Sequence, residues 1–155
     1  MLFRAAVPGR FCKYWLPLML WMAFIFTAST QLGAPNNTSY FFRPIMHWLF
    51  PGMPEDTLEH IHHIVRKTGH FVEYAMLGAL SWRAVHFDRA FASFTPRRHF
   101  WFALLFCLFY ASTDEFHQSF VPTRQPAVLD VLLDTCGSAT ALLAIWAARK
   151  RRAAA

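Results

Sequence analysis

The sequence predicts an all-α membrane protein, in which a four-helix transmembrane bundle carries an outer amphipathic segment before its second helix. Hydrophobic residues make up 55% of the 155-residue chain and charged residues only 15%, whereas an average soluble domain has about 25% charged residues. Four apolar segments follow one another, and their polar residues gather at matching ends. The length suits a single domain over residues 1–155.

The first apolar segment, residues 14–30, is just long enough to cross a bilayer core of about 30 Å. Pro17 lies near its predicted start, where proline disturbs a helix least. A signal peptide is the alternative, but Ser29-Thr30-Gln31 is a poor cleavage site and further apolar segments follow. We therefore interpret this segment as a retained membrane anchor.

Residues 31–56 are rich in proline and are expected to form an irregular loop, with an aromatic stretch in the membrane interface. The stretch EDTLEHIHHIVRK then predicts an amphipathic helix that leads into the second apolar segment, residues 68–85. Its histidines, His60, His62 and His63, fit an interfacial helix face better than a ligand set.

A basic loop precedes the third segment, residues 99–118, and the turn SFVPTRQP leads to the fourth, residues 127–148. Both segments contain carboxylates, so a soluble helical bundle is an alternative. However, their large apolar residues lie all round the helix, which is typical of helices that are buried or in lipid. Four short helices cannot all be buried in so small a protein, and this favours the membrane.

The three cysteines, Cys12, Cys107 and Cys136, have neither zinc-ligand nor disulfide-framework spacing. We expect Cys107 and Cys136 to be small buried hydrophobic residues.

The basic residues predict the orientation of the chain. With the N-terminus inside, the cytoplasmic pieces hold Arg4, Arg10, Lys13, Arg89, Arg97, Arg98, Arg149, Lys150, Arg151 and Arg152. The outer pieces hold Arg43, Arg66, Lys67 and Arg124. This bias predicts a multi-pass protein of the bacterial inner (cytoplasmic) membrane with both termini in the cytoplasm. The net charge of +6 is thereby accounted for, and no nucleic-acid partner is expected.

The predicted topology brings the polar residues of three helices to the outer membrane face. Helical spacing gives each of these helices one polar stripe that faces the others, and the fourth helix adds the small residues Gly137 and Ala141 that permit close packing. The expected ligand-binding residues are Lys67, His70, Glu73, Tyr74, Tyr110, Gln118, Arg124, Asp130 and Asp134, and the candidate acids and bases are Asp114, Glu115 and His117. Ionisable groups inside membrane segments indicate a functional site, and a purely structural salt-bridge network is the alternative.

At these residues the chain resembles the VanZ-like family of small bacterial membrane proteins. The resemblance covers most of residues 14–148 and is carried by RKTGHFVEYAMLGAL, YASTDEFHQSFVPTRQP and LDVLLDTCGSATAL. Thr123 stands where the family usually has Gly, and Ala or Thr replaces a second Gly near the fourth helix. The resemblance implies membrane location and architecture, and a link to resistance against the glycopeptide antibiotic teicoplanin.

Three classes of function fit these residues. The first binds or processes a lipid-linked envelope component or another anionic small molecule, with Lys67 and Arg124 holding a phosphate or carboxylate and Asp114 or Glu115 with His117 as base and acid. No cofactor is predicted, although a divalent metal on His117, Asp114, His70 and Glu73 is a variant of this class. The second class is a non-enzymatic scaffold or regulator among membrane lipids, and the third is a proton or small-solute transporter.

Overall fold

The computed structural model describes residues 8–30, 34–121 and 127–154, and these residues form helices and short connections. The helices are α1 (Pro8–Ala28), α2 (Pro35–Leu49), α3 (Glu55–Phe87), α4 (Pro96–Gln118) and α5 (Val128–Ala154), with a short 3₁₀ turn at Arg89–Phe91. The described residues include no strand. The all-α prediction is therefore confirmed, with α2 as an additional helix.

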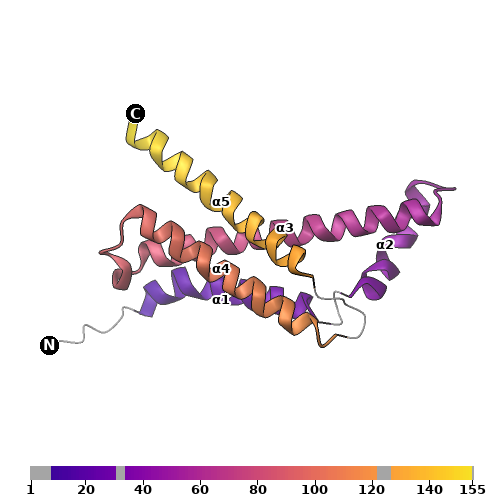
Figure 1. Ribbon diagram of the computed structural model, residues 1–155, viewed down its shortest axis with the longest axis horizontal. Helices are drawn as coiled ribbons and strands as arrows, with labels where there is room; N and C mark the ends of the chain where they lie inside the picture. The colour runs from indigo at the N-terminus through magenta and orange to yellow at the C-terminus, as the bar shows by residue number, and fades with distance from the viewer. Residues whose placement is uncertain (1–7, 31–33, 122–126, 155) are drawn as a thin grey trace.

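The central helix is α3, which contacts α1, α2, α4 and α5. In Figure 1, α1 and α4 run in one direction, and α3 runs in the opposite direction. The helix α5 starts beside the middle of α3, packs on α3 and α4, and diverges from them toward its C-terminal end (Figure 1). The C-terminal ends of α1 and α4 and the start of α5 therefore lie at the same end of the bundle, beside the middle of α3 (Figure 1).

The predicted amphipathic stretch and the second apolar segment form one continuous helix. At 33 residues, α3 is about 50 Å long, which exceeds a bilayer core of about 30 Å. Glu55 and Asp56 lie in its first turn, where negative charge favours the helix dipole. The N-terminal part of α3 projects beyond the bundle, with α2 beside it (Figure 1).

The prediction of an irregular loop over residues 31–56 was wrong for residues 35–49, which form α2. Pro35 occupies the first turn, where a missing N–H costs nothing, while Pro44 lies inside the helix. Contacts with the first turn of α3 hold α2 in place: Glu55 Oε2 forms an ion pair with Arg43 at 3.0 Å, and Glu55 Oε1 lies 3.1 Å from His47 Nε2. Such contacts are not visible in the local sequence, which shows only the prolines.

One of the predicted interfacial histidines, His62, joins α3 to α2. Its Nε2 lies 3.1 Å from the Thr38 hydroxyl, and its ring stacks on Phe42 with a centroid distance of 4.7 Å. Burial, followed by the positive charges of Arg66 and Arg43, lowers the pKa of His62. His62 is therefore a packing residue of the α2–α3 contact.

Two helical windows, Phe11–Ala28 and Val128–Ala154, are long and apolar enough to cross a membrane. Only 11% of the first and 22% of the second is buried, whereas the core helix of a soluble protein would be mostly buried. Large apolar side chains also face outward on α4, including Phe109 at 70% exposure. Together these surfaces suggest a membrane protein.

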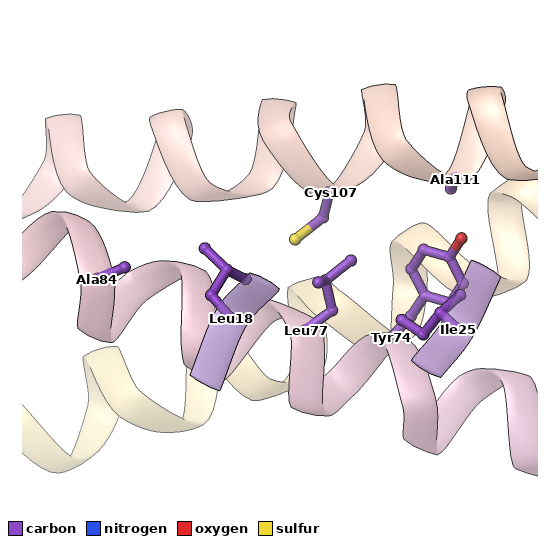
Figure 2. Close-up of a cluster of buried hydrophobic side chains, with 7 residues drawn as sticks. All are labelled: Leu18, Ile25, Tyr74, Leu77, Ala84, Cys107 and Ala111. Atoms are coloured by element: carbon purple, nitrogen blue, oxygen red, sulfur yellow. The ribbon is translucent and has the colours of Figure 1, made fainter. Parts of the chain in front are cut away.

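The helix α1 begins at Pro8, earlier than predicted, so Pro17 lies inside the helix and not near its start. Proline is tolerated inside membrane helices, because neighbouring groups satisfy the freed carbonyl. Figure 2 shows Leu18 and Ile25 of α1 among the buried core residues, which also include Tyr74, Leu77, Ala84, Cys107 and Ala111. The helix α1 is thus an integral part of the core.

Cys107 is buried as expected, but Cys136 is exposed, so the prediction for Cys136 was wrong. Its neighbour on α5, Gly137, faces α3 instead. A Cβ atom at Gly137 would overlap the Phe71 carbonyl oxygen, and one at Gly78 would lie 2.9 Å from the Ser138 carbonyl oxygen. Two glycines thus bring the backbones of α3 and α5 together, in the manner of small-residue packing in membranes.

Candidate functional site

The end of the bundle where α1 and α4 finish and α5 begins holds a cluster of buried polar side chains. We call this set the polar cluster. It consists of Ser29, Tyr74, Asp114, Gln118, Asp134 and Ser138, all of which are buried. The cluster draws on every helix of the bundle, because Ser29 directly follows α1, Tyr74 lies on α3, Asp114 and Gln118 on α4, and the last two on α5.

Asp114 links α1 to α4. Its side chain is 4% exposed, and its Oδ2 accepts hydrogen bonds from the Ser29 hydroxyl at 2.8 Å and from Gln118 Nε2 at 2.9 Å. Gln118 is one helical turn from Asp114, which allows the second bond within α4. The other oxygen, Oδ1, is buried and has no hydrogen-bond partner among the described residues.

Asp134, on α5, is the second buried carboxylate of the polar cluster. It is 3% exposed, and its Oδ1 lies 3.9 Å from His70 Nδ1, which is beyond hydrogen-bond range. Ser138, one turn further, donates to the Tyr74 carbonyl oxygen at 2.9 Å. This bond fixes α5 against α3 and places Asp134 beside Tyr74.

Hydrogen bonds from two aromatic side chains to backbone carbonyl oxygens hold α1 in place beside the cluster. The Tyr110 hydroxyl donates to the Met22 carbonyl oxygen at 2.6 Å, and Trp21 Nε1 donates to the Glu73 carbonyl oxygen at 2.9 Å. His117 stacks on Phe26 with a centroid distance of 4.4 Å. The stripe on α4 that contains Tyr110, Asp114 and His117 therefore faces α1.

Glu115 and Lys67 have partners that define their roles. Glu115 Oε1 accepts a hydrogen bond from the Ala127 N–H at 2.6 Å, immediately before α5, where a carboxylate favours the helix dipole. Lys67 forms an ion pair with Asp130, and the two side chains are 39% and 37% exposed. Lys67 and Asp130 therefore lie at a half-exposed rim of the buried polar cluster.

The structure thus brings most of the predicted residues together. Tyr74, Asp114, Gln118 and Asp134 lie in the polar cluster, and Lys67, His70, Tyr110, Glu115, His117 and Asp130 contact it or its helices through the bonds above. Glu73 contributes its backbone carbonyl. Arg124 lies outside the described residues, so its predicted role stays a prediction.

Ser138 and Trp21 were missed by sequence reasoning, and Ser29 was not among the predicted site residues. Ser29 directly follows the last residue of α1, and Ser138 follows Asp134 by one helical turn. A search for hydroxyl groups one turn from a membrane carboxylate would have found Ser138. Trp21 looks like an ordinary apolar residue, and no sequence signal identifies its bond.

Within residues 8–30, 34–121 and 127–154, no three His, Cys, Asp or Glu side chains are grouped so that they could hold a metal ion. The carboxylates of Asp114 and Asp134 can instead accept hydrogen bonds or stabilise a positive charge. The Lys67 ammonium at the rim can hold an anionic group.

The opposite end of the bundle contains a second group of polar and aromatic side chains, Trp82, His86, His99 and Arg149, which we call the histidine end. Arg149 Nη1 donates to His86 Nε2 at 2.9 Å, and the His86 and His99 rings meet edge to face at 5.2 Å. Burial, then Arg149 and His99, lowers the pKa of His86. Nearby, Trp15 Nε1 donates to Asp88 Oδ2 at 2.6 Å.

A family model described as VanZ/LLP1 matches residues 14–149, well over half of the chain. The matched range includes every helix of the polar cluster. Neither a curated protein nor a solved structure matches the sequence.

Proposed function

The chain belongs to the VanZ/LLP1 family, and on that premise we propose that it is a multi-pass membrane protein whose polar cluster binds the headgroup of a lipid-linked cell-envelope component. The observation that carries this proposal is the pair of buried carboxylates, Asp114 and Asp134, each with one oxygen that lacks a hydrogen-bond partner among the described residues. Unsatisfied buried polar atoms are uncommon in native proteins, and a catalytic role or a bound ion is one explanation for them. An ion pair at the rim, Lys67 with Asp130, offers an ammonium group for a phosphate.

The proposed topology has four spans, formed by α1, residues 68–85 of α3, α4 and α5, with both termini in the cytoplasm. The alternating directions of these helices and the basic residues near Arg97 and Arg149 support this arrangement. The polar cluster then lies toward the outer leaflet. A reporter fused to the C-terminus should be active only in the cytoplasm, and activity only outside the cell would contradict the topology.

A catalytic version of the same site uses Asp114 or Glu115 with His117 as base and acid. The contacts of Glu115 favour Asp114 for this role, because Glu115 Oε1 is bonded to the backbone N–H before α5. A metal-assisted version would bind a divalent ion in stoichiometric amount. Metal analysis of the purified protein, with His117→Ala as the control, tests that version directly.

The second candidate function is structural, and the Asp114 bonds support it. Two donors from α1 and α4 converge on one carboxylate oxygen, so the cluster also locks the helices together. A scaffold or regulator would need only this locking. The two candidate functions predict different effects on stability and on function when a carboxylate charge is removed without disturbing the packing.

The first experiment therefore replaces carboxylates by amides of the same shape. Asp114→Asn and Asp134→Asn, with Asp56→Asn in the exposed first turn of α3 as the control, are compared for thermal unfolding in detergent and for glycopeptide tolerance in cells. Loss of tolerance with an unchanged unfolding midpoint is expected for a binding site. If tolerance falls only in step with stability, the cluster is structural.

A binding measurement tests the proposed ligand itself. We expect a polyprenyl phosphate to raise the unfolding midpoint of the purified protein, and the matching polyprenol without phosphate to raise it much less. Lys67→Ala should remove most of the difference, since a charge-assisted hydrogen bond is worth about 1.5–3 kcal/mol. Equal effects of the two lipids would contradict phosphate recognition.

A further inference from the structure

Three buried polar atoms lie in the polar cluster without a well-formed hydrogen bond to a described residue. They are Asp114 Oδ1, Asp134 Oδ1 and the Tyr74 hydroxyl. Tyr74 is 0% exposed, and its hydroxyl lies near both carboxylates, close enough to Asp114 to donate toward it while its oxygen still accepts from another group. Figure 2 shows this hydroxyl on the side of α3 that faces α4, near Ala111.

A buried polar atom without a partner costs about 1–3 kcal/mol, and more if it is charged. Three such atoms in one place therefore strongly favour the binding of a group that can form a hydrogen bond with each of them. Two of the three are carboxylate oxygens, which only accept hydrogen bonds when ionised. The matching group must donate hydrogen bonds, and a positive charge on it would offset the two carboxylates.

The surroundings do not supply such a group from the described side chains. The Lys67 ammonium is paired with Asp130 at the rim, and His70 Nδ1 lies 3.9 Å from Asp134 Oδ1, too far for a hydrogen bond. Ser29 and Gln118 donate to the other oxygen of Asp114. Glu73, Glu115 and Asp130 add further negative charge near Asp134.

We propose that the polar cluster binds a primary ammonium group, held by Asp114, Asp134 and the Tyr74 hydroxyl. A primary ammonium has one positive charge and three N–H donors, one for each of the three atoms. This inference rests on the proposed function, because it concerns the same site and assigns the cationic part of its ligand. The ammonium belongs either to a phospholipid headgroup or to an amine carried by the lipid-linked component.

The test uses the full-length protein in nanodiscs of phosphatidylcholine, because the headgroup of this lipid has no N–H. Methylammonium chloride should raise the unfolding midpoint in a saturable way, whereas tetramethylammonium and sodium chloride should not. Asp114→Asn, Asp134→Asn and Tyr74→Phe should each weaken the methylammonium response about tenfold or more, and Asp56→Asn should leave it unchanged. Tyr74→Phe removes one hydroxyl and keeps the ring, so at least one variant should fold normally.

The outcomes separate the inference from the proposed function. If sodium chloride raised the unfolding midpoint as much as methylammonium does, the site would bind simple cations and the ammonium site would be overturned. The same holds if methylammonium has no effect on the wild-type protein while the variants unfold at the wild-type midpoint, which would indicate water in the cluster. Failure of polyprenyl phosphate binding with an intact methylammonium response would overturn only the proposed lipid-linked ligand. If nanodiscs with phosphatidylethanolamine already give the full stabilisation, the headgroup is the source of the ammonium, and otherwise the source is another amine.

Discussion

The two ends of the bundle both bury ionisable groups, but they do so with opposite chemistry. The polar cluster is acidic, and two of its carboxylate oxygens have no partner among the described residues. The histidine end pairs His86 with Arg149 and surrounds it with aromatic rings, including a contact of Arg149 over Trp82 at 5.7 Å. The acidic end thus has carboxylate oxygens without partners, whereas the unpartnered buried atoms of the histidine end are two ring nitrogens, His86 Nδ1 and His99 Nδ1, beside the positive charge of Arg149.

The two ends differ in the charge of the buried groups, and this difference favours the acidic end as the ligand site. An unpartnered buried carboxylate costs more stability than an unpartnered neutral ring nitrogen, because the penalty is larger for charged groups. At the acidic end α3 and α5 also approach closely, at Gly78 and Gly137. Close helix packing there compensates for the unfavourable carboxylates.

The largest effect is expected from Gly137→Val, which removes that compensation. A Cβ at Gly137 would overlap the Phe71 carbonyl oxygen, so α3 and α5 must separate, at a cost of about 3 kcal/mol, the upper end of the usual range for overpacking. The unfolding midpoint in detergent is the measurement. Gly69→Ala is the control, because no atom lies within 4 Å of a Cβ there, and a similar loss for both variants would refute the close contact.

The next largest effect is expected from Asp114→Ala. Ser29 and Gln118 would lose their buried acceptor, and we expect a loss of about 2–3 kcal/mol. Asp114→Asn, which keeps an acceptor oxygen, should lose clearly less when unfolding of the two variants is compared. Equal losses would mean that the charge, and not the hydrogen bonds to Ser29, stabilises this end.

At the opposite end, Trp15→Phe should cost about 1–2 kcal/mol, because it removes the indole hydrogen bond to Asp88 and keeps most of the ring contacts. Trp48→Phe is the matched control, since Trp48 is 80% exposed on α2. Differential scanning fluorimetry of the two variants compares them. A loss at Trp15 no larger than at Trp48 would show that this bond contributes nothing.

The smallest effect concerns the pH dependence of the histidine end. The folded-state pKa of His86 is below the ordinary value of 6.5, so the unfolded chain binds more protons as pH falls through about 6.5. His86 should therefore lower stability as the pH is reduced from 7 toward 5, and His86→Gln should reduce that decline. His60→Gln, at an exposed site on α3, should leave the decline unchanged; an unaltered profile in both variants would exclude His86 as its source.

Much of the fold could be predicted from the sequence, because long apolar segments separated by basic loops leave few alternatives. The helices at residues 14–30, 68–85, 99–118 and 127–148 correspond to α1, α3, α4 and α5. The additional helix α2 could not be predicted, because its stability depends on Glu55 and His62, which follow it in the sequence. Local signals there are dominated by Pro44 and its neighbours.

The candidate site was only partly predictable for a related reason. Helical spacing identified which residues share a face, and Asp114 and Asp134 indeed lie together with Tyr74. Spacing does not say which oxygen of a carboxylate finds a partner, so neither the bonds of Asp114 nor the helix-start contact of Glu115 could be foreseen. The histidine end was missed because its members come from three helices and carry no local motif.

The hydrogen bonds that hold α1 have a consequence for how the chain is made. Ser29 bonds to a residue 85 positions later in the sequence, and Met22 accepts from one 88 positions later. At about 5–20 residues per second of synthesis, α1 is made roughly 4–17 s before these α4 residues. In the proposed multi-pass topology, α1 would therefore enter the membrane without its α4 contacts and would depend on the insertion machinery until α4 arrives.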